Sequence, residues 1–242
     1  MKNLGLTSKQ FLVTLGLIVA VLAANAQSNE AAYRAYINNS LGLWKQAINE
    51  TDDKSFERAI AYQGYLSATM ADQDEEAFDM YYDDAVDLLE ELVEQDEYSA
   101  QSKALFSSLY GLSIAYDGWK GMFLGSKASG LASEAYQAAP EDPLVLRMYA
   151  SNKFYTPESF GGDRKEALEV CKKSVKAYES SGDMANNHLY LDALALLGMI
   201  HSNSGNVDSA ISVYERALEV EPDFGWVKFA LLPSAKKTKS GS

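Results

Sequence analysis

Apolar residues recur at every third or fourth position through most of the chain, which is the period of one face of an α-helix. The stretch 75–95 shows this period most clearly, and its apolar stripe is formed by Phe78, Tyr81, Ala85, Leu88, Leu89 and Leu92. The same period predicts a helix over 30–50, with Trp44 and Ala47 facing inward, and another over 55–71. Regular β-type alternation flanked by turn residues is not evident. The pattern therefore predicts an all-α chain.

The segment Leu191–Pro222 carries a more specific pattern. Small residues at Gly198 and Ala210 allow two helices to approach closely, and turn-forming residues lie between them. Counted from Leu191 as position 1, the characteristic positions are Leu194 (4), Leu197 (7), Gly198 (8), Ala210 (20), Tyr214 (24), Ala217 (27) and Pro222 (32). This segment resembles the tetratricopeptide repeat, which has Leu-Gly, two alanines, an aromatic residue and a proline at these positions. It departs at position 11, where His201 replaces the usual aromatic residue.

Two longer units precede this repeat and share one spacing. Ala150 and Ala167 take positions 8 and 20 of the nearer unit, and they are further apart in sequence than Gly198 and Ala210 of the clearest unit. The earlier unit, represented by Gly111 and Ala128, has the same lengthened spacing. About five extra residues, in YTPESFGG, are therefore expected in the inter-helix turn of the nearer unit, and both units resemble elongated tetratricopeptide-type helix pairs. Cys171 falls at position 24 of the nearer unit, where a small buried side chain is expected.

The resemblance implies a right-handed superhelical array of antiparallel helix pairs, a tetratricopeptide-like solenoid of about three to four units. Such an array needs its last apolar face covered, so the segment DFGWVKFALL after Pro222 is expected to form a C-terminal capping helix. We therefore expect a single helical-repeat domain over 27–233. The residues 234–242, rich in Lys and Ser, predict a disordered tail.

The segment 1–26 has the features of an export signal. Lys2 and Lys9 provide positive charge, the stretch 11–23 is apolar, and Ala24-Asn25-Ala26 fits a small-residue cleavage site, so cleavage is expected before Gln27. An uncleaved anchor is the alternative, although the apolar run is shorter than the about 20 residues that span a bilayer. The sequence thus predicts an exported bacterial protein that is periplasmic or otherwise associated with the cell envelope.

Charge and titratable residues argue against several classes of function. Without the signal segment, 19 basic residues face 34 acidic ones, so nucleic acid is not an expected partner, and membrane contact is expected only if the signal segment stays uncleaved. The acidic residues of 72–97 are expected on a solvated helix face, and the alternative is an acidic patch for a basic partner or weak divalent-ion binding. Cys171 is the only cysteine, and His188 and His201 lack a metal-binding spacing. We predict no metal, no cofactor and no enzymatic activity.

The concave face of the array is the predicted partner-binding groove. In tetratricopeptide-like proteins the first helix of each pair lines this face, at positions 2, 5, 9 and 12. Mapped onto three units, these positions give Leu105, Ser108, Leu112 and Ala115; Leu144, Arg147, Ser151 and Phe154; Asp192, Ala195, Met199 and Ser202. This set does not reproduce the Lys/Asn carboxylate clamp of chaperone-binding members, so a charged peptide C-terminus is not favoured as the ligand.

The resulting prediction is a non-enzymatic envelope scaffold or adaptor that binds a protein or peptide in this groove through apolar and aromatic anchors. The alternative is a helical-repeat protein that binds a small molecule and serves an envelope transporter. An open groove would favour the scaffold, whereas a closed channel through the fold would favour the small-molecule carrier.

The stretch SFGGDRKEAL, 159–168, has two glycines before a helix and so raises the question of a phosphate-binding loop. The repeat register places it in an inter-helix turn, where Gly161 and Gly162 allow unusual backbone angles and Asp163 caps the next helix. No strand is predicted before it, so we interpret it as a turn. Whether Tyr155 and Phe160 in this turn flank the groove is left open by the sequence.

Overall fold

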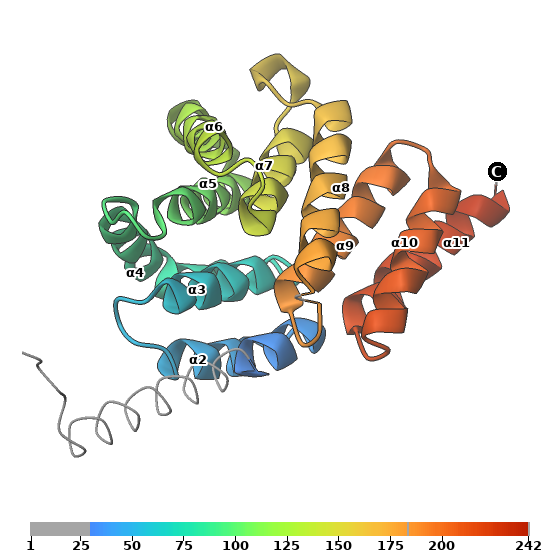
Figure 1. Ribbon diagram of the computed structural model, residues 1–242, viewed down its shortest axis with the longest axis horizontal. Coiled ribbons are helices and arrows are strands. Elements are labelled where there is room, and N and C mark those ends of the chain that lie inside the picture. The colour runs from blue at the N-terminus through green and yellow to red at the C-terminus, as the bar shows by residue number, and fades with distance from the viewer. Residues whose placement is uncertain (1–29, 183, 242) are drawn as a thin grey trace, which may run out of the picture.

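The computed structural model describes residues 30–182 and 184–241 (Figure 1). Within these residues the regular structure is entirely helical: a helix over 30–37, then α2 (Leu41–Asn49), α3 (Phe56–Thr69), α4 (Glu75–Val93), α5 (Ser99–Tyr116), α6 (Gly121–Ala138), α7 (Pro143–Tyr155), α8 (Arg164–Ser181), α9 (His188–Asn203), α10 (Val207–Val220) and α11 (Leu232–Gly241). Short turns of 3₁₀-helix, η1 (Gly118–Lys120) and η2 (Glu158–Phe160), lie in two connections, and a π-helical segment, η3 (Val227–Leu231), precedes α11. The predicted signal segment lies outside the described residues.

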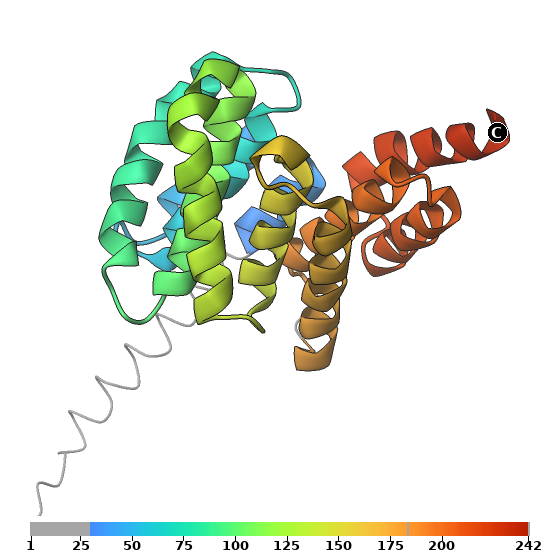
Figure 2. The same ribbon diagram turned by 90° about the horizontal axis from the view of Figure 1, so that it is seen from above.

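The helices are arranged as consecutive antiparallel pairs, α3–α4, α5–α6, α7–α8 and α9–α10. The first helix of each pair also packs on the first helix of the next, and the second helix packs on the following first helix. Figure 2 shows the array from above, with the pairs side by side in chain order and α11 at the far end. The predicted all-α array of helix pairs with a C-terminal capping helix is confirmed.

Close approach within the array depends on glycine at two positions. A Cβ atom added to Gly198 in α9 would lie 2.2 Å from the ring of Tyr214 in α10, and one added to Gly64 in α3 would lie 2.3 Å from the Trp44 ring. The close-packing role predicted for Gly111 differs from the structure, because nothing lies within 4 Å of a Cβ there. One helical turn earlier, the buried Ser107 donates a hydrogen bond of 2.7 Å to the Ala128 carbonyl and makes the contact with α6 instead.

The helix starts follow from local hydrogen bonding. Six of the described α-helices begin after a residue whose side chain accepts a hydrogen bond from a backbone N–H of the first turn: Ser40, Ser55, Asp74, Asp142, Asp163 and Asn187. Such caps satisfy N–H groups that have no partner within the helix. Specific helix boundaries are therefore encoded within a few residues.

The turn between α7 and α8 confirms the interpretation of the Gly-Gly stretch. Gly161 has a φ of +94°, and a Cβ on Gly162 would lie 1.8 Å from the Thr156 carbonyl oxygen, so both positions need glycine. The Asp163 carboxylate accepts hydrogen bonds from the N–H groups of Lys165 and Glu166 at 2.8 and 3.0 Å. These bonds lower the pKa of Asp163. The stretch is thus a capped turn.

Two hydrophobic clusters form the interior, and α7 contributes to both. Trp44, Tyr65 and Phe78 belong to the cluster around α2–α5, whereas Tyr190 and Tyr214 belong to the cluster around α8–α10. These five rings are almost completely buried. Because each cluster joins several pairs, a residue in one pair is stabilised by its neighbours along the array.

Two segments differ from the sequence prediction. The helix predicted over 30–50 is broken at Asn39, whose φ is +47°, and Ser40 starts α2 as a new helix. The predicted disordered tail instead lies largely in α11, where Ala235 is buried. The lysines of this tail reach the acidic face of α10: Lys236 lies 2.9 Å from Glu215, and Lys239 lies 2.7 Å from Asp208.

Candidate functional site

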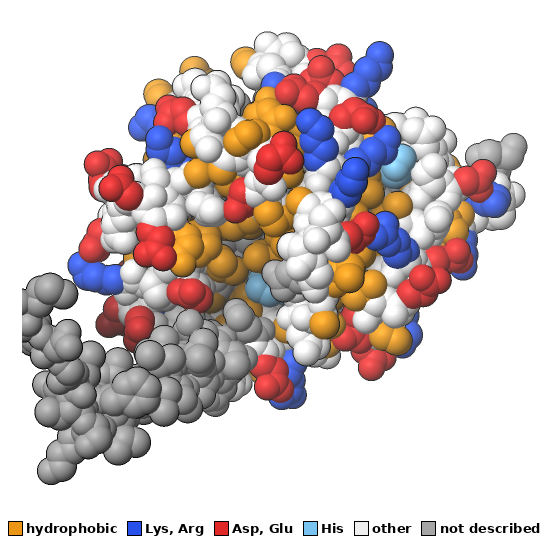
Figure 3. All heavy atoms as spheres, in the orientation of Figure 1, with side chains coloured by type: hydrophobic (Ala, Val, Ile, Leu, Met, Phe, Trp, Pro, Cys, Tyr) orange, Lys and Arg blue, Asp and Glu red, His pale blue; other side chains and the backbone are white. Residues whose placement is uncertain are grey.

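The first helices of the pairs surround a hollow on one face of the molecule. Figure 3 shows apolar side chains gathered in this hollow, over the region of α3, α5, α7 and α9. This is the concave face on which the groove was predicted. The residues that line it fall into three groups: those covered by the 30–37 helix, those at the C-terminal ends of α7 and α9, and those around a cavity beside α2.

The centre of the predicted groove holds an internal ion pair. Arg147 on α7 and Asp192 on α9 meet with Nε 2.5 Å from Oδ2 and Nη2 2.9 Å from Oδ1. Their side chains are 13% and 15% exposed. Burial and the Asp192 carboxylate raise the pKa of Tyr36, whose hydroxyl donates to Asp192 Oδ1 at 3.0 Å. Three groups from three helices therefore interact directly with one another.

The 30–37 helix closes this part of the array by contacting its far end. Tyr33 donates a hydrogen bond of 2.6 Å to Glu221, just after α10. The Tyr36 ring lies 5.2 Å from the Phe224 ring, and a Cβ on Gly225 would lie 3.3 Å from the Ile37 carbonyl oxygen. The helix at the start of the described chain thus lies against residues near its end.

The remaining predicted groove residues divide by accessibility. Leu105, Leu144 and Ala195 are buried in the core, and Ser108 accepts a hydrogen bond of 3.3 Å from Gln63 on α3. Ala115 is exposed, whereas the residues that are half-buried are Leu112, Ser151, Phe154, Met199 and Ser202.

The α7–α8 turn presents two exposed aromatic rings. Tyr155 is 64% exposed and Phe160 is 78% exposed. The Tyr155 ring contacts Phe154 edge-on at 4.8 Å. Burial of its hydroxyl raises its pKa, while Arg147 lowers it and Asp192 raises it, so the hydroxyl end lies close to the ion pair. We call Ser151, Phe154, Tyr155, Phe160, Met199 and Ser202 the outer rim.

A further exposed apolar group was not identified as a site from the sequence. Trp119, Met122 and Phe123, at η1 and the start of α6, are each more than 70% exposed. Their i, i+3, i+4 spacing places them on one side of the helix start, and this spacing could have identified them from the sequence as an apolar surface group. Tyr33 and Tyr36 were missed for another reason: their partners are 188 and 156 residues away in sequence, beyond any local pattern.

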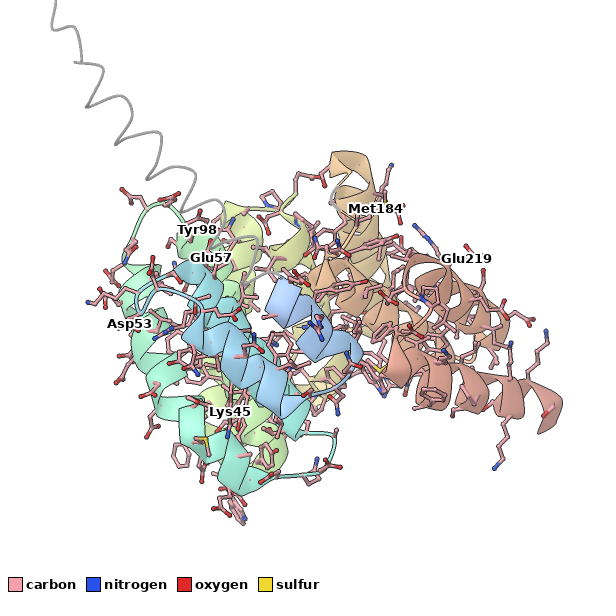
Figure 4. The ribbon with its side chains drawn as sticks, turned by 90° about the horizontal axis from the view of Figure 1, so that it is seen from below. Lys45, Asp53, Glu57, Tyr98, Met184 and Glu219 are labelled. Atoms are coloured by element: carbon pink, nitrogen blue, oxygen red, sulfur yellow. The ribbon has the colours of Figure 1, made fainter. Side chains whose placement is uncertain are left out.

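A cavity of about 290 Å³ lies at the mouth of the hollow, between the 30–37 helix, α2, the start of α3 and the connection from α8 to α9. Figure 4 shows this side of the molecule, with Glu57 and the connection marked by Met184 on either side of the start of the 30–37 helix. Its lining residues are Ala32, Ala47, Thr51, Glu57, Ile60, Ala61, Ala185, Asn186, Asn187, His188 and Leu189.

The titratable groups singled out from the sequence lie in packed surroundings. Cys171 is fully buried, and burial raises the pKa of its thiol to about 12, so it is not a reactive thiolate. Burial lowers the pKa of His188 to about 4 and also lowers that of the half-buried His201. Among the described residues, no three His, Cys, Asp or Glu side chains are grouped to hold a metal ion. None of the described helices has the length and apolar character of a membrane span.

Comparison with known proteins agrees with this architecture. The tetratricopeptide repeat family matches residues 191–224, which include most of α9 and all of α10. A crystal structure of a thermophilic tetratricopeptide repeat protein from Thermus thermophilus superimposes with a TM-score of 0.53, at 16% sequence identity, over 95% of this chain and 100% of that one. No curated protein matches the chain. Residues 191–224 therefore match the tetratricopeptide repeat family, and the chain as a whole has a tetratricopeptide-repeat-like fold.

Proposed function

We propose that this protein is a non-enzymatic scaffold, or adaptor, that binds a protein or peptide partner in the cell envelope. The fold suggests the general role, because tetratricopeptide-repeat proteins generally bind other proteins. The envelope location rests on the signal segment predicted over 1–26 and its cleavage site at Ala24-Asn25-Ala26. Arg147 and Asp192 pair with each other inside the array, so the partner is expected at the outer rim.

The observation that carries the proposal is the exposure of Tyr155 and Phe160 on the hydrogen-bonded turn between α7 and α8. Two hydrogen bonds join this turn to α7: the Asp163 N–H donates to the Lys153 carbonyl at 3.0 Å, and Lys153 Nζ donates to the Gly161 carbonyl at 3.3 Å. Aromatic rings that are held in place before binding make good interface anchors, because little conformational entropy is lost on association. Half-buried Phe154 supplies an apolar floor beside them.

Site-specific photocrosslinking in intact cells tests this proposal. A photoreactive phenylalanine analogue at Phe160 should capture a defined protein, whereas the same group at Phe229 on the capping segment, which is 76% exposed, serves as the matched control. Substituting Tyr155→Ala together with Phe160→Ala should weaken binding of the captured protein by at least tenfold, since each anchor contributes on the order of 1–2 kcal/mol. Equal capture at both positions, or unchanged binding by the double variant, would contradict the proposed docking surface.

A second candidate is a small-molecule carrier that serves an envelope transporter. It is favoured by the closure of the concave face by the 30–37 helix and by the cavity of about 290 Å³ beside it. A cavity of this size is near the lower end of the range for small-molecule sites. The two functions are separable, because the outer rim and the cavity share no residue.

A further inference from the structure

The cavity beside α2 has a wall of small apolar side chains and a few polar groups. Ala32, Ala47 and Ala61 are buried and form a smooth apolar surface, with Ile60 and Leu189 beside them. Thr51 is bonded internally, because its hydroxyl donates to the Ile48 carbonyl at 2.7 Å. The Asn187 side chain caps α9, so the polar groups available to a ligand are Glu57, His188 and the exposed Asn186.

Glu57 brings a carboxylate to the cavity without a basic partner of its own. The neighbouring cations are engaged elsewhere: Arg58 pairs with Asp53 and donates to the carbonyls of Ile48 and Thr51, and Lys54 pairs with Glu91. No ion pair to Glu57 occurs within the described part of the chain. Glu57 is half-buried, so a cation placed beside it would interact more strongly than at an open surface.

His188 completes the lining as a neutral polar group. It is only 8% exposed, and its ring contacts Trp44 at 5.5 Å and Tyr36 at 5.9 Å. Neither ring nitrogen makes a hydrogen bond within the described residues. Burial holds its pKa near 4, so the imidazole is uncharged at neutral pH. As part of the cavity lining, the imidazole can hydrogen-bond to a ligand there.

The lining therefore has a single formal charge, which is negative, next to an apolar wall. Size limits the occupant: an engineered apolar cavity of about 150 Å³ binds benzene, so about 290 Å³ accommodates one ring with a short side arm. The strongly acidic chain also raises the local concentration of small cations. A hydrated inorganic cation would leave the apolar wall unused.

We propose that this cavity is a binding site for a small organic amine, with the ammonium group beside the Glu57 carboxylate and the apolar part against the alanine wall. His188 hydrogen-bonds to the amine or to a polar group next to it. This site is separate from the scaffold function proposed above and deepens the carrier alternative by naming the class of ligand.

Titration of the purified protein with phenethylamine, followed by calorimetry and ligand-detected NMR, tests the site. The neutral analogue 2-phenylethanol should bind at least tenfold more weakly. Glu57→Gln should weaken phenethylamine binding by about 10- to 100-fold, because a charge-assisted hydrogen bond is lost. Glu219→Gln is the matched control, since Glu219 is an exposed carboxylate on α10, well away from Glu57 in Figure 4.

A second variant separates binding in the cavity from binding at the surface. Ala185→Trp should block the mouth without disturbing the core, because Ala185 is exposed. Its control is Ala138→Trp at the end of α6. Absence of phenethylamine binding, equal affinity for 2-phenylethanol, or equal effects of Glu57→Gln and Glu219→Gln would overturn the proposal. These measurements involve no protein partner, so their outcome is independent of the crosslinking experiment.

Discussion

Removing the Asp192 carboxylate tests whether the centre of the concave face is structural. Asp192→Ala leaves the Arg147 guanidinium without its partner in a site where both side chains are no more than 15% exposed. It also leaves the Tyr36 hydroxyl without its acceptor. Losing one member of a buried ion pair typically costs about 3–5 kcal/mol of unfolding free energy. We expect a loss of that size.

The pair as a whole should contribute much less than this single substitution suggests. Desolvation of both charges offsets most of their attraction, so apolar replacements of similar volume are often neutral. Arg147→Met with Asp192→Leu would still leave the Tyr36 hydroxyl unpaired, at about 1–3 kcal/mol. Adding Tyr36→Phe removes the unpaired hydroxyl and its free-energy cost. The triple variant should therefore lie within about 1.5 kcal/mol of the unmodified protein.

Urea denaturation followed by circular dichroism at 222 nm gives the unfolding free energies. Glu91→Ala is the control, because the Lys54–Glu91 pair has side chains that are 73% and 46% exposed and should contribute at most about 1 kcal/mol. A loss below about 1 kcal/mol for Asp192→Ala would refute the assigned burial of the pair. So would a triple variant as unstable as Asp192→Ala.

Three further outcomes follow from the packing. Gly198→Val should destabilise the protein by at least about 1–3 kcal/mol in urea denaturation, because the valine side chain would meet the Tyr214 ring. The control Gly130→Ala, in the exposed part of α6, should be neutral or slightly stabilising. Similar losses for the two variants would contradict the close approach of α9 and α10. The folded pKa of His188 is about 4, below its ordinary 6.5, so the unfolded chain binds the proton more readily and the unfolding free energy should fall by up to about 3 kcal/mol between pH 6.5 and 4. His188→Gln should lose that much less stability over the same pH range. Equal pH dependence in the two proteins would contradict the burial of His188. Tyr33→Phe removes the hydrogen bond to Glu221, so amide hydrogen exchange should become faster over 30–37 and stay unchanged in α4. Exchange over 30–37 that is as slow as in the unmodified protein would count against the contact.

The helix pairs were predictable because their determinants are local. Gly198 and Tyr214 belong to adjacent helices joined by a short turn, and the cap of α8 at Asp163 is formed entirely within the first turn of that helix. Apolar period, small residues and caps all indicate the same helices, so they reinforce one another. The residue that contacts the neighbouring helix was harder to predict where a helix has several small residues. In α5, Ser107 contacts α6, whereas Gly111 does not.

The contents of the candidate site were only partly predictable. The repeat register placed Arg147 and Asp192 on the same face, and the structure brings them into contact. It gave no indication that Tyr36 covers them, because an apolar or aromatic stripe on a helix does not specify its distant partner. The ordered tail was missed for the same reason: the lysines of α11 look like a solvated tail until the carboxylates of α10 are placed beside them.

The contacts made by Tyr33 also bear on the order in which the chain can fold. Most pairs in the array can form as soon as two neighbouring helices exist, whereas Tyr33 must wait for Glu221, which is 188 residues later. At a synthesis rate of about 5–20 residues per second, that interval is about 10–40 s. The alanines of the 30–37 helix belong to the cluster of α2–α5 and can pack early, but Tyr33 and Tyr36 lack Glu221 and Asp192 until α9 and α10 exist, so the earliest segment of the described fold completes its contacts late.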